Sequence, residues 1–109
     1  MIIAALASAP GKAGISVIRL SGNHSVNTLI QFLSSKKISK NLEYRKLYLT
    51  KFVSEGEEID EIIVVFFEED HSYTGEESAE IYCHGSPLIV RKILESLYAH
   101  KDVREAEPG

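Results

Sequence analysis

Polar and apolar residues alternate from Ser78 to His84, and the tripeptide Gly85-Ser86-Pro87 follows directly. Alternation with a period of two is typical of a β-strand that has one buried face. Proline is favoured at the first position of a helix and serine at the cap before it, so a helix is expected from Pro87. A strand that runs straight into a helix indicates a fold that packs helices on a sheet.

The remaining elements extend this unit to an α/β (α+β) sandwich, a single small domain in which two helices cover a mixed sheet of about five strands. The expected strands are Ile2–Ala7, Ile15–Gly22, Tyr44–Val53, Ile59–Phe67 and Ser78–His84. The first helix is expected after a cap at Asn23 or Ser25. The expected buried stripes are Val26, Leu29, Ile30 and Leu33 in the first helix, and Val90, Ile93, Leu94 and Leu97 in the second. The six consecutive apolar residues Ile62–Phe67 predict a strand covered on both faces.

Charge and composition narrow the function classes. The net charge of −4 argues against a domain that grips nucleic acid by itself, and we interpret the short basic stretches Lys36–Lys40 and Arg45–Lys51 as solvated surface. No apolar run is long enough to span a bilayer, and the first residues lack the positive region of a signal peptide, so no membrane association is expected. A single cysteine excludes an internal disulfide and fits a cytoplasmic location.

The strand Ser78–His84 has a polar face. Because side chains alternate, Ala79, Ile81 and Cys83 are expected to face the core, while Glu80, Tyr82 and His84 share the other side. Polar groups at a strand end beside a helix N-terminus are typical of ligand sites in α/β folds. A solvent-exposed polar face fits the same pattern, so both interpretations stay open.

Arg19 is the only charged residue in the predicted strand Ile15–Gly22, where it lies between apolar neighbours. Its guanidinium cannot lose its charge, and desolvating an unpaired charge is costly. It therefore needs a carboxylate or an anionic ligand. A structural ion pair and a ligand contact both satisfy that need.

Several kinds of active site are excluded by spacing. Cys83 and His84 are adjacent on a strand, so they point to opposite faces and cannot form a nucleophilic dyad. The loop APGKAGIS lacks the spacing of a phosphate-binding loop and leads into a strand rather than a helix. The four histidines show no metal-ligand spacing, and no catalytic residue is predicted.

Two motifs carry a resemblance to a known family. The stretch AALASAPGKAGISVIRLSG spans Ala4–Gly22, SYTGEESAEIYCHGS spans Ser72–Ser86, and the chain closes on Pro108-Gly109. In this order they resemble the amino-terminal domain of the TrmE/MnmE tRNA-modification GTPases over the whole chain, 1–109. Three departures from the family pattern are Glu77 in place of Asp, Ser86 in place of a second Gly, and Ser8-Ala9 in place of Thr-Pro.

The resemblance implies a fold similar to the tetrahydrofolate-binding domain of the glycine-cleavage T protein. It also implies a homodimer that holds 5-formyltetrahydrofolate or a related tetrahydrofolate, the one-carbon donor for modifying the wobble uridine of tRNA. The folate contacts implied by the motifs are Arg19 and Glu80, and His84 is a weaker candidate. A pterin edge offers two adjacent N–H donors, which one carboxylate can accept as a pair.

The resemblance also sets what this segment is not expected to do. The family pattern continues beyond Gly109 with a segment whose lysine is a third folate contact, so the domain is expected to be truncated and to bind folate weakly or not at all. The GTPase domain, which holds GTP, Mg²⁺ and K⁺, and the helical domain lie outside it, as do contacts with tRNA and a flavin-dependent partner protein. The alternative is a pure dimerisation or interaction module in which Arg19 and Glu80 form a structural ion pair.

Overall fold

A computed structural model describes residues 1–9, 11, 14–69 and 75–106. Within these ranges the chain forms one mixed sheet of six strands in the order β3-β4-β5-β2-β1-β6, with three helices. The strands are β1 (Ile2–Leu6), β2 (Ile15–Ser21), β3 (Tyr48–Ser54), β4 (Glu57–Phe67), β5 (Ser78–His84) and β6 (Val103–Glu105). The helices are α1 (Ser25–Ile30), α2 (Lys37–Lys40) and α3 (Pro87–Tyr98). The predicted α/β class is confirmed.

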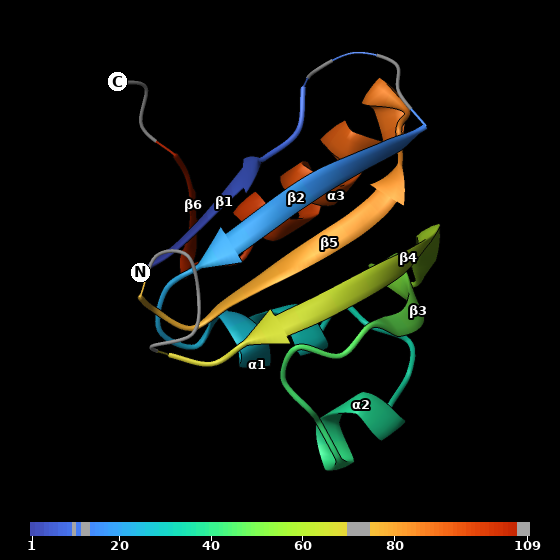
Figure 1. Cartoon of the computed structure of the whole chain (residues 1–109). Helices are drawn as coiled ribbons and strands as arrows, with labels where there is room; N and C mark the ends of the chain where they lie inside the picture. The colour runs from blue at the N-terminus through green and yellow to red at the C-terminus, as the bar shows by residue number, and fades with distance from the viewer. Residues whose placement is uncertain (10, 12–13, 70–74, 107–109) are drawn as a thin grey trace.

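The helices α1 and α3 pack on the same face of the sheet, and the core lies between them and the strands (Figure 1). Burying one face of the sheet and one stripe of each helix removes apolar surface from water, which is the main stabilising contribution to such a fold. The largest fully buried side chains are Phe52, Phe66, Ile2, Ile18, Leu20, Leu29, Ile62, Ile81, Ile93 and Leu97. The predicted stripe of α3 is confirmed at Val90, Ile93 and Leu97, while Leu94 is partly buried.

The junction between β5 and α3 forms as predicted. The Ser86 hydroxyl accepts a hydrogen bond from the backbone N–H of Ile89 at 3.4 Å, and Pro87 occupies the first turn. A capping hydroxyl satisfies one of the backbone donors that a helix leaves unpaired at its start. The strand therefore ends where the cap begins, which fixes the position of the polar residues just before it.

The predicted cap of α1 is wrong. The residue before this helix is His24, in the left-handed region at φ 72°, and its side chain makes no capping bond. The carboxylate of Glu77, which immediately precedes β5 and is distant in sequence, accepts from the backbone N–H of Val26 at 2.8 Å instead. The helix is also shorter than expected, because Leu33 already pairs with Phe52 in an isolated β-bridge. A tertiary contact replaces the local cap here.

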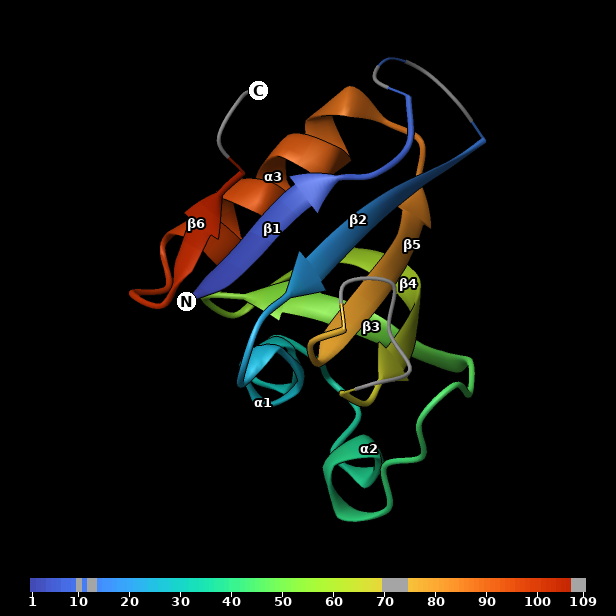
Figure 2. The ribbon, with the colours of Figure 1, turned by 60° about the vertical axis from the view of Figure 1, so that its left-hand side comes forward.

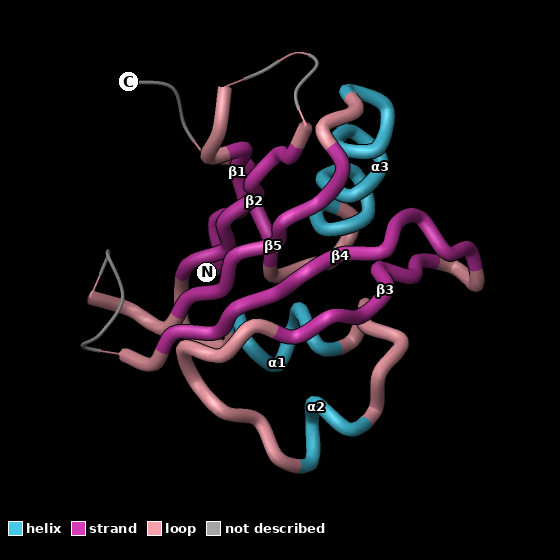
Figure 3. The backbone as a smooth tube through the Cα atoms, turned by 45° about the vertical axis from the view of Figure 1, so that its right-hand side comes forward, coloured by secondary structure: helices cyan, strands magenta, loops and turns pink. Residues whose placement is uncertain are grey.

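Two elements of the structure, β6 and α2, were not predicted from the sequence. Residues of the C-terminal tail form β6, which pairs in parallel with β1 through Ile2 and Val103 (Figure 2). The polar connector between α1 and β3 contains the short helix α2, anchored by buried Ile38 (Figure 3). The strand β3 begins at Tyr48 rather than Tyr44, because Arg45 adopts φ 62° and its N–H bonds to the carbonyl of Phe66.

The sheet face opposite α1 and α3 is called the outer face here. It carries Val17 and Arg19 from β2, Ile63 and Val65 from β4, and Glu80 and Tyr82 from β5, as the strand registers place them. The expectation that Ile62–Phe67 is covered on both faces is wrong in part, since Ile63 is 37% exposed. Within the described ranges no helix lies over this face; Ile63 is open to solvent there, whereas Val65 is buried at 7% exposure.

Candidate ligand-binding site

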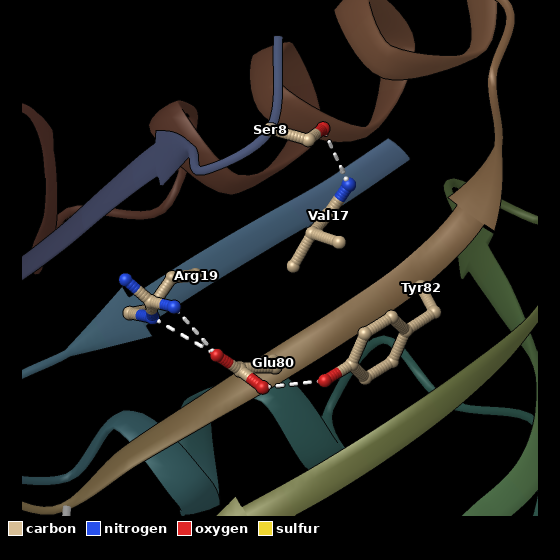
Figure 4. Close-up of polar contacts among 5 residues, drawn as sticks. All are labelled: Ser8, Val17, Arg19, Glu80 and Tyr82. Atoms are coloured by element: carbon tan, nitrogen blue, oxygen red, sulfur yellow. Dashed lines mark hydrogen bonds and ion pairs between the residues drawn. The ribbon is translucent and has the colours of Figure 1, made fainter. Parts of the chain in front are cut away.

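Arg19 and Glu80 stand directly opposite each other on the outer face, because β2 and β5 pair antiparallel with these two residues in register. The Arg19 Nη2 donates to Glu80 Oε2 at 2.7 Å, and Nε donates to the same oxygen at 3.1 Å (Figure 4). The Arg19 side chain is 38% exposed and that of Glu80 is 15% exposed. The two residues singled out by alternation therefore meet, in a half-buried ion pair.

Tyr82 completes this group from two residues further along β5. Its hydroxyl donates to the other carboxylate oxygen, Glu80 Oε1, at 2.5 Å (Figure 4). The hydrogen bond to Glu80, with burial, raises the pKa of Tyr82 to about 12. Alternation along the strand placed Tyr82 on the same face as Glu80, but their hydrogen bond was not predicted. The spacing of two residues between the phenol and the carboxylate is the sequence feature that could have indicated it. Arg19, Glu80 and Tyr82 are called the Glu80 cluster below.

The cluster holds Glu80 as an anion. Burial acts to raise the pKa of this carboxyl, but the hydrogen bonds from Tyr82 and Arg19 and the charge of Arg19 outweigh it, so its pKa lies below the ordinary value. A carboxylate offers about four acceptor positions, and Glu80 uses two at Oε2 for Arg19 and one at Oε1 for Tyr82. Oε1 therefore keeps one acceptor position for a ligand N–H, and a second, adjacent N–H can bind at Oε2 only in place of one of the two bonds from Arg19.

His84 lies at the end of β5 and is held by Asp60 of β4. The Asp60 Oδ2 accepts from the backbone N–H of His84 at 2.9 Å, and Oδ1 lies 2.7 Å from the imidazole Nδ1. The carboxylate is almost fully covered at 8% exposure, whereas the imidazole is 70% exposed. Sequence reasoning missed Asp60, which is far from His84 in the chain and meets it only through the pairing of β4 and β5.

A small pocket of about 170 Å³ opens beside Tyr82 and His84. Its lining combines apolar residues from four strands with these two polar groups: Ile15, Leu49, Ile62, Ile63 and Cys83, together with Gly14 and Glu61. Arg19 and Glu80 lie outside this lining. The outer face therefore presents the ion-paired Glu80 cluster and, beside it, a mostly apolar hollow with an imidazole at its edge.

A family model described as "GTP-binding protein TrmE N-terminus" matches residues 2–109 of this chain. The chain belongs to this TrmE amino-terminal family. Among its relatives are proteins named "tRNA modification GTPase MnmE" from Natranaerobius thermophilus, 40% identical over 98% of this chain, and from Fervidobacterium nodosum, 45% identical over 87%. The protein of that name from Thermotoga maritima is 39% identical over 98% of the chain. The resemblance drawn from the two motifs is thereby confirmed.

The chain spans about a quarter of the length of these relatives, with 24%, 21% and 23% of the three proteins covered. Of the two TrmE motifs, Arg19, Glu77, Glu80 and His84 are described in the structure. The stretch Ser72–Thr74 of the second motif and the closing Pro108–Gly109 lie outside the described residues. Assignment of Arg19, Glu80 and His84 as folate contacts stays a prediction, because family membership alone does not test it.

Other chemistry in this TrmE domain is limited by burial and spacing. Cys83 faces the core at 3% exposure, opposite to His84, and its Sγ lies 3.7 Å from the carbonyl of Ser16. Burial, with the nearby charge of Asp60, raises the pKa of the Cys83 thiol to about 11, which disfavours the nucleophilic thiolate form. The described residues contain no group of three His, Cys, Asp or Glu side chains arranged to hold a metal ion. No helix in these ranges is long and apolar enough to cross a lipid bilayer.

Proposed function

We propose that this chain is the folate-binding, dimer-forming domain of a tRNA-modifying GTPase, and that the Glu80 cluster holds the pterin end of 5-formyltetrahydrofolate or a related tetrahydrofolate. The observation that supports this most directly is the position of Glu80. It is an anionic carboxylate, mostly covered, on a sheet face with no helix over it in the described ranges. Because Arg19 and Tyr82 already compensate the partial burial of this carboxylate, it can bind the planar donor edge of a ligand without the full cost of losing its own hydration.

The donor chemistry of the cluster fits the ligand. A pterin edge presents a ring N–H and an exocyclic amine side by side. Oε1 of Glu80 keeps one acceptor position beside its bond from Tyr82, and Oε2 can accept the second donor when it exchanges one of its two bonds from Arg19. Arg19 is 38% exposed, so its guanidinium can also donate to a carbonyl or carboxylate oxygen of the ligand. Tyr82 keeps Oε1 oriented. The bound folate supplies the one-carbon unit, and the residues of this chain bind and orient it.

The wider role is proposed from the relatives, which are named tRNA modification GTPase MnmE. In the proposed whole protein, GTP, Mg²⁺ and K⁺ belong to a separate GTPase domain, while tRNA and a flavin-dependent protein are its partners in the cytoplasm. This domain contributes folate binding and homodimerisation. It has no catalytic residue of its own in this proposal.

Folate titration of Glu80→Gln tests the proposal. A primary amide accepts at one atom only, so it cannot take both pterin donors, and the dissociation constant for 5-formyltetrahydrofolate should rise about tenfold or more. Titration followed by NMR is suited to a chain of 109 residues and detects millimolar affinity. Glu105→Gln on β6 is the matched control, since it removes the same charge from an exposed position outside the outer face. Equal affinity of Glu80→Gln and wild type would remove Glu80 from the site.

A second candidate function is a pure dimerisation module. It is favoured by two observations: Arg19 and Glu80 already satisfy each other, and Ile15 and Leu49 are exposed apolar side chains of the sheet. Under this alternative, folate produces no chemical-shift change in any variant, while sedimentation shows a concentration-dependent dimer. Leu49→Asp should then abolish the dimer, whereas Leu88→Asp, at an exposed position on α3, should leave it intact.

A further inference from the structure

His84 has a fixed orientation despite its exposure. One carboxylate, that of Asp60, contacts both the backbone N–H of His84 and the imidazole Nδ1, at 2.9 and 2.7 Å. An ionised carboxylate only accepts hydrogen bonds, so the network assigns the proton to Nδ1. In the neutral ring Nε2 is then an acceptor that points away from Asp60. The end of β5 does not need a buried carboxylate bound to the exposed imidazole of His84 in order to remain in the sheet.

The position of this imidazole relates it to the Glu80 cluster. Glu80, Tyr82 and His84 follow one another on the same side of β5. At about 3.3 Å per residue, the Cα atoms of Glu80 and His84 are separated by about 13 Å along the strand. Tyr82 and His84 also line the pocket of about 170 Å³, with Ile15 and Ile63 beside them. The row therefore consists of a carboxylate, an apolar hollow and a hydrogen-bond acceptor, in that order.

We propose that His84 and Asp60 form a second polar subsite of the ligand site, in which Nε2 of His84 accepts a hydrogen bond from a secondary N–H in the aminobenzoyl-glutamate half of a tetrahydrofolate. This inference rests on the proposed folate function. A tetrahydrofolate is an elongated molecule with a donor edge at the pterin, an aryl ring next along it, and N–H groups on both sides of that ring. The row on β5 offers complementary groups in the same order: a carboxylate, an apolar hollow and a hydrogen-bond acceptor. Asp60 does not touch the ligand and acts as a positioning residue.

Asp60→Asn separates positioning from mere support of the fold. The amide oxygen can still accept from the His84 backbone N–H, while the amide nitrogen donates to Nδ1 in place of accepting from it. The shape and both contacts are preserved. The imidazole must then carry its proton on Nε2, so the acceptor presented to the ligand becomes a donor. His84→Ala is the second variant, and because the imidazole is 70% exposed its removal should leave the fold intact.

The spectroscopic test uses ¹⁵N-labelled histidine in long-range ¹H–¹⁵N NMR spectra at about pH 8.5, two pH units above the ordinary imidazole pKa. Wild type is expected to show a protonated Nδ1 and an unprotonated Nε2 at His84, and Asp60→Asn should reverse the two. This readout is independent of folate and does not respond to a purely structural role. A wild-type ring protonated at Nε2 would overturn the inference.

Titration with 5-formyltetrahydrofolate supplies the second readout. We expect the His84 Nε2 resonance to shift on binding, and both Asp60→Asn and His84→Ala to weaken binding about three- to tenfold, the effect of one neutral hydrogen bond. If wild type binds and Glu80→Gln weakens it while both of these variants bind normally, the subsite is overturned and the folate function stands. If wild type shows no binding, the proposed function fails and the subsite fails with it.

Discussion

Tyr82→Phe removes one hydroxyl from the Glu80 cluster and leaves its ring in place. The lost bond is the 2.5 Å contact to Glu80 Oε1, a carboxylate that is only 15% exposed. Hydrogen bonds to charged groups contribute roughly 1.5–3 kcal/mol to stability when buried. Because this cluster is half-buried and Arg19 continues to neutralise Glu80, we expect a loss near the lower end, about 1.5 kcal/mol.

Urea unfolding at neutral pH measures this loss. The midpoint should fall while the m-value stays unchanged, since the surface exposed on unfolding is the same. Tyr44→Phe is the matched control: Tyr44 is exposed, so the loss of its hydroxyl should change the free energy of unfolding by less than about 0.5 kcal/mol. Equal midpoints for wild type and Tyr82→Phe would refute the energetic role assigned to this hydrogen bond.

The pH dependence of the same variant follows from two pKa shifts. The pKa of Glu80 is lowered in the folded protein, so its contribution is complete above the ordinary carboxyl value and is lost as pH falls through the lowered one. The difference between wild type and Tyr82→Phe should therefore shrink in acid, below about pH 4. The pKa of Tyr82 is raised to about 12, so its contribution is complete below the ordinary value of 10.0 and is lost between 10.0 and 12. If the difference in unfolding free energy between wild type and Tyr82→Phe stayed the same in acid and in alkali, the hydrogen bond between Tyr82 and ionised Glu80 would be contradicted.

Two further predictions concern the fold around the site. Gly22→Ala should lower the free energy of unfolding by more than about 2 kcal/mol, because φ is +130° and a Cβ would approach the Met1 carbonyl oxygen; Gly14→Ala, with open space around it, is the control in the same urea assay. Cys83 should react with a thiol reagent at least about a hundredfold more slowly in the folded protein than in urea, because it is buried and its pKa is raised to about 11. Equal rates in the two states would show that Cys83 is accessible.

The polar face of β5 was predictable because it depends on a local rule. Alternation along Ser78–His84 fixes which side chains share a face, and the burial of Ala79, Ile81 and Cys83 confirms it. The same rule applied to β2 did not decide which of its faces is buried, so it left the side of the sheet on which Arg19 lies undetermined. The meeting of the two side chains required the register of the antiparallel pair, which neither strand specifies alone.

The contacts missed from sequence are those made across long separations. Asp60 reaches His84, and Glu77 caps α1, through tertiary proximity that no local pattern encodes. The prediction that the apolar run of β4 is covered on both faces was wrong in part for a related reason. Its composition is that of a strand covered on both sides, but no helix of the described ranges lies over the outer face, and Ile63 remains exposed. The local pattern of a strand predicts which of its side chains share a face, whereas tertiary packing determines which residues those side chains contact.

The structural and ligand-binding interpretations of Arg19 and Glu80 are compatible in physical terms. A binding carboxylate left alone on a half-buried surface would pay part of its desolvation cost in the free protein and gain less on binding. Arg19 and Tyr82 remove that problem, since Arg19 donates twice to Oε2 and Tyr82 donates once to Oε1, which leaves an acceptor position at Oε1. The two roles then differ in one measurable respect. A purely structural pair makes Glu80→Gln lower stability alone, whereas a preformed ligand site makes the same change lower stability modestly and folate affinity strongly.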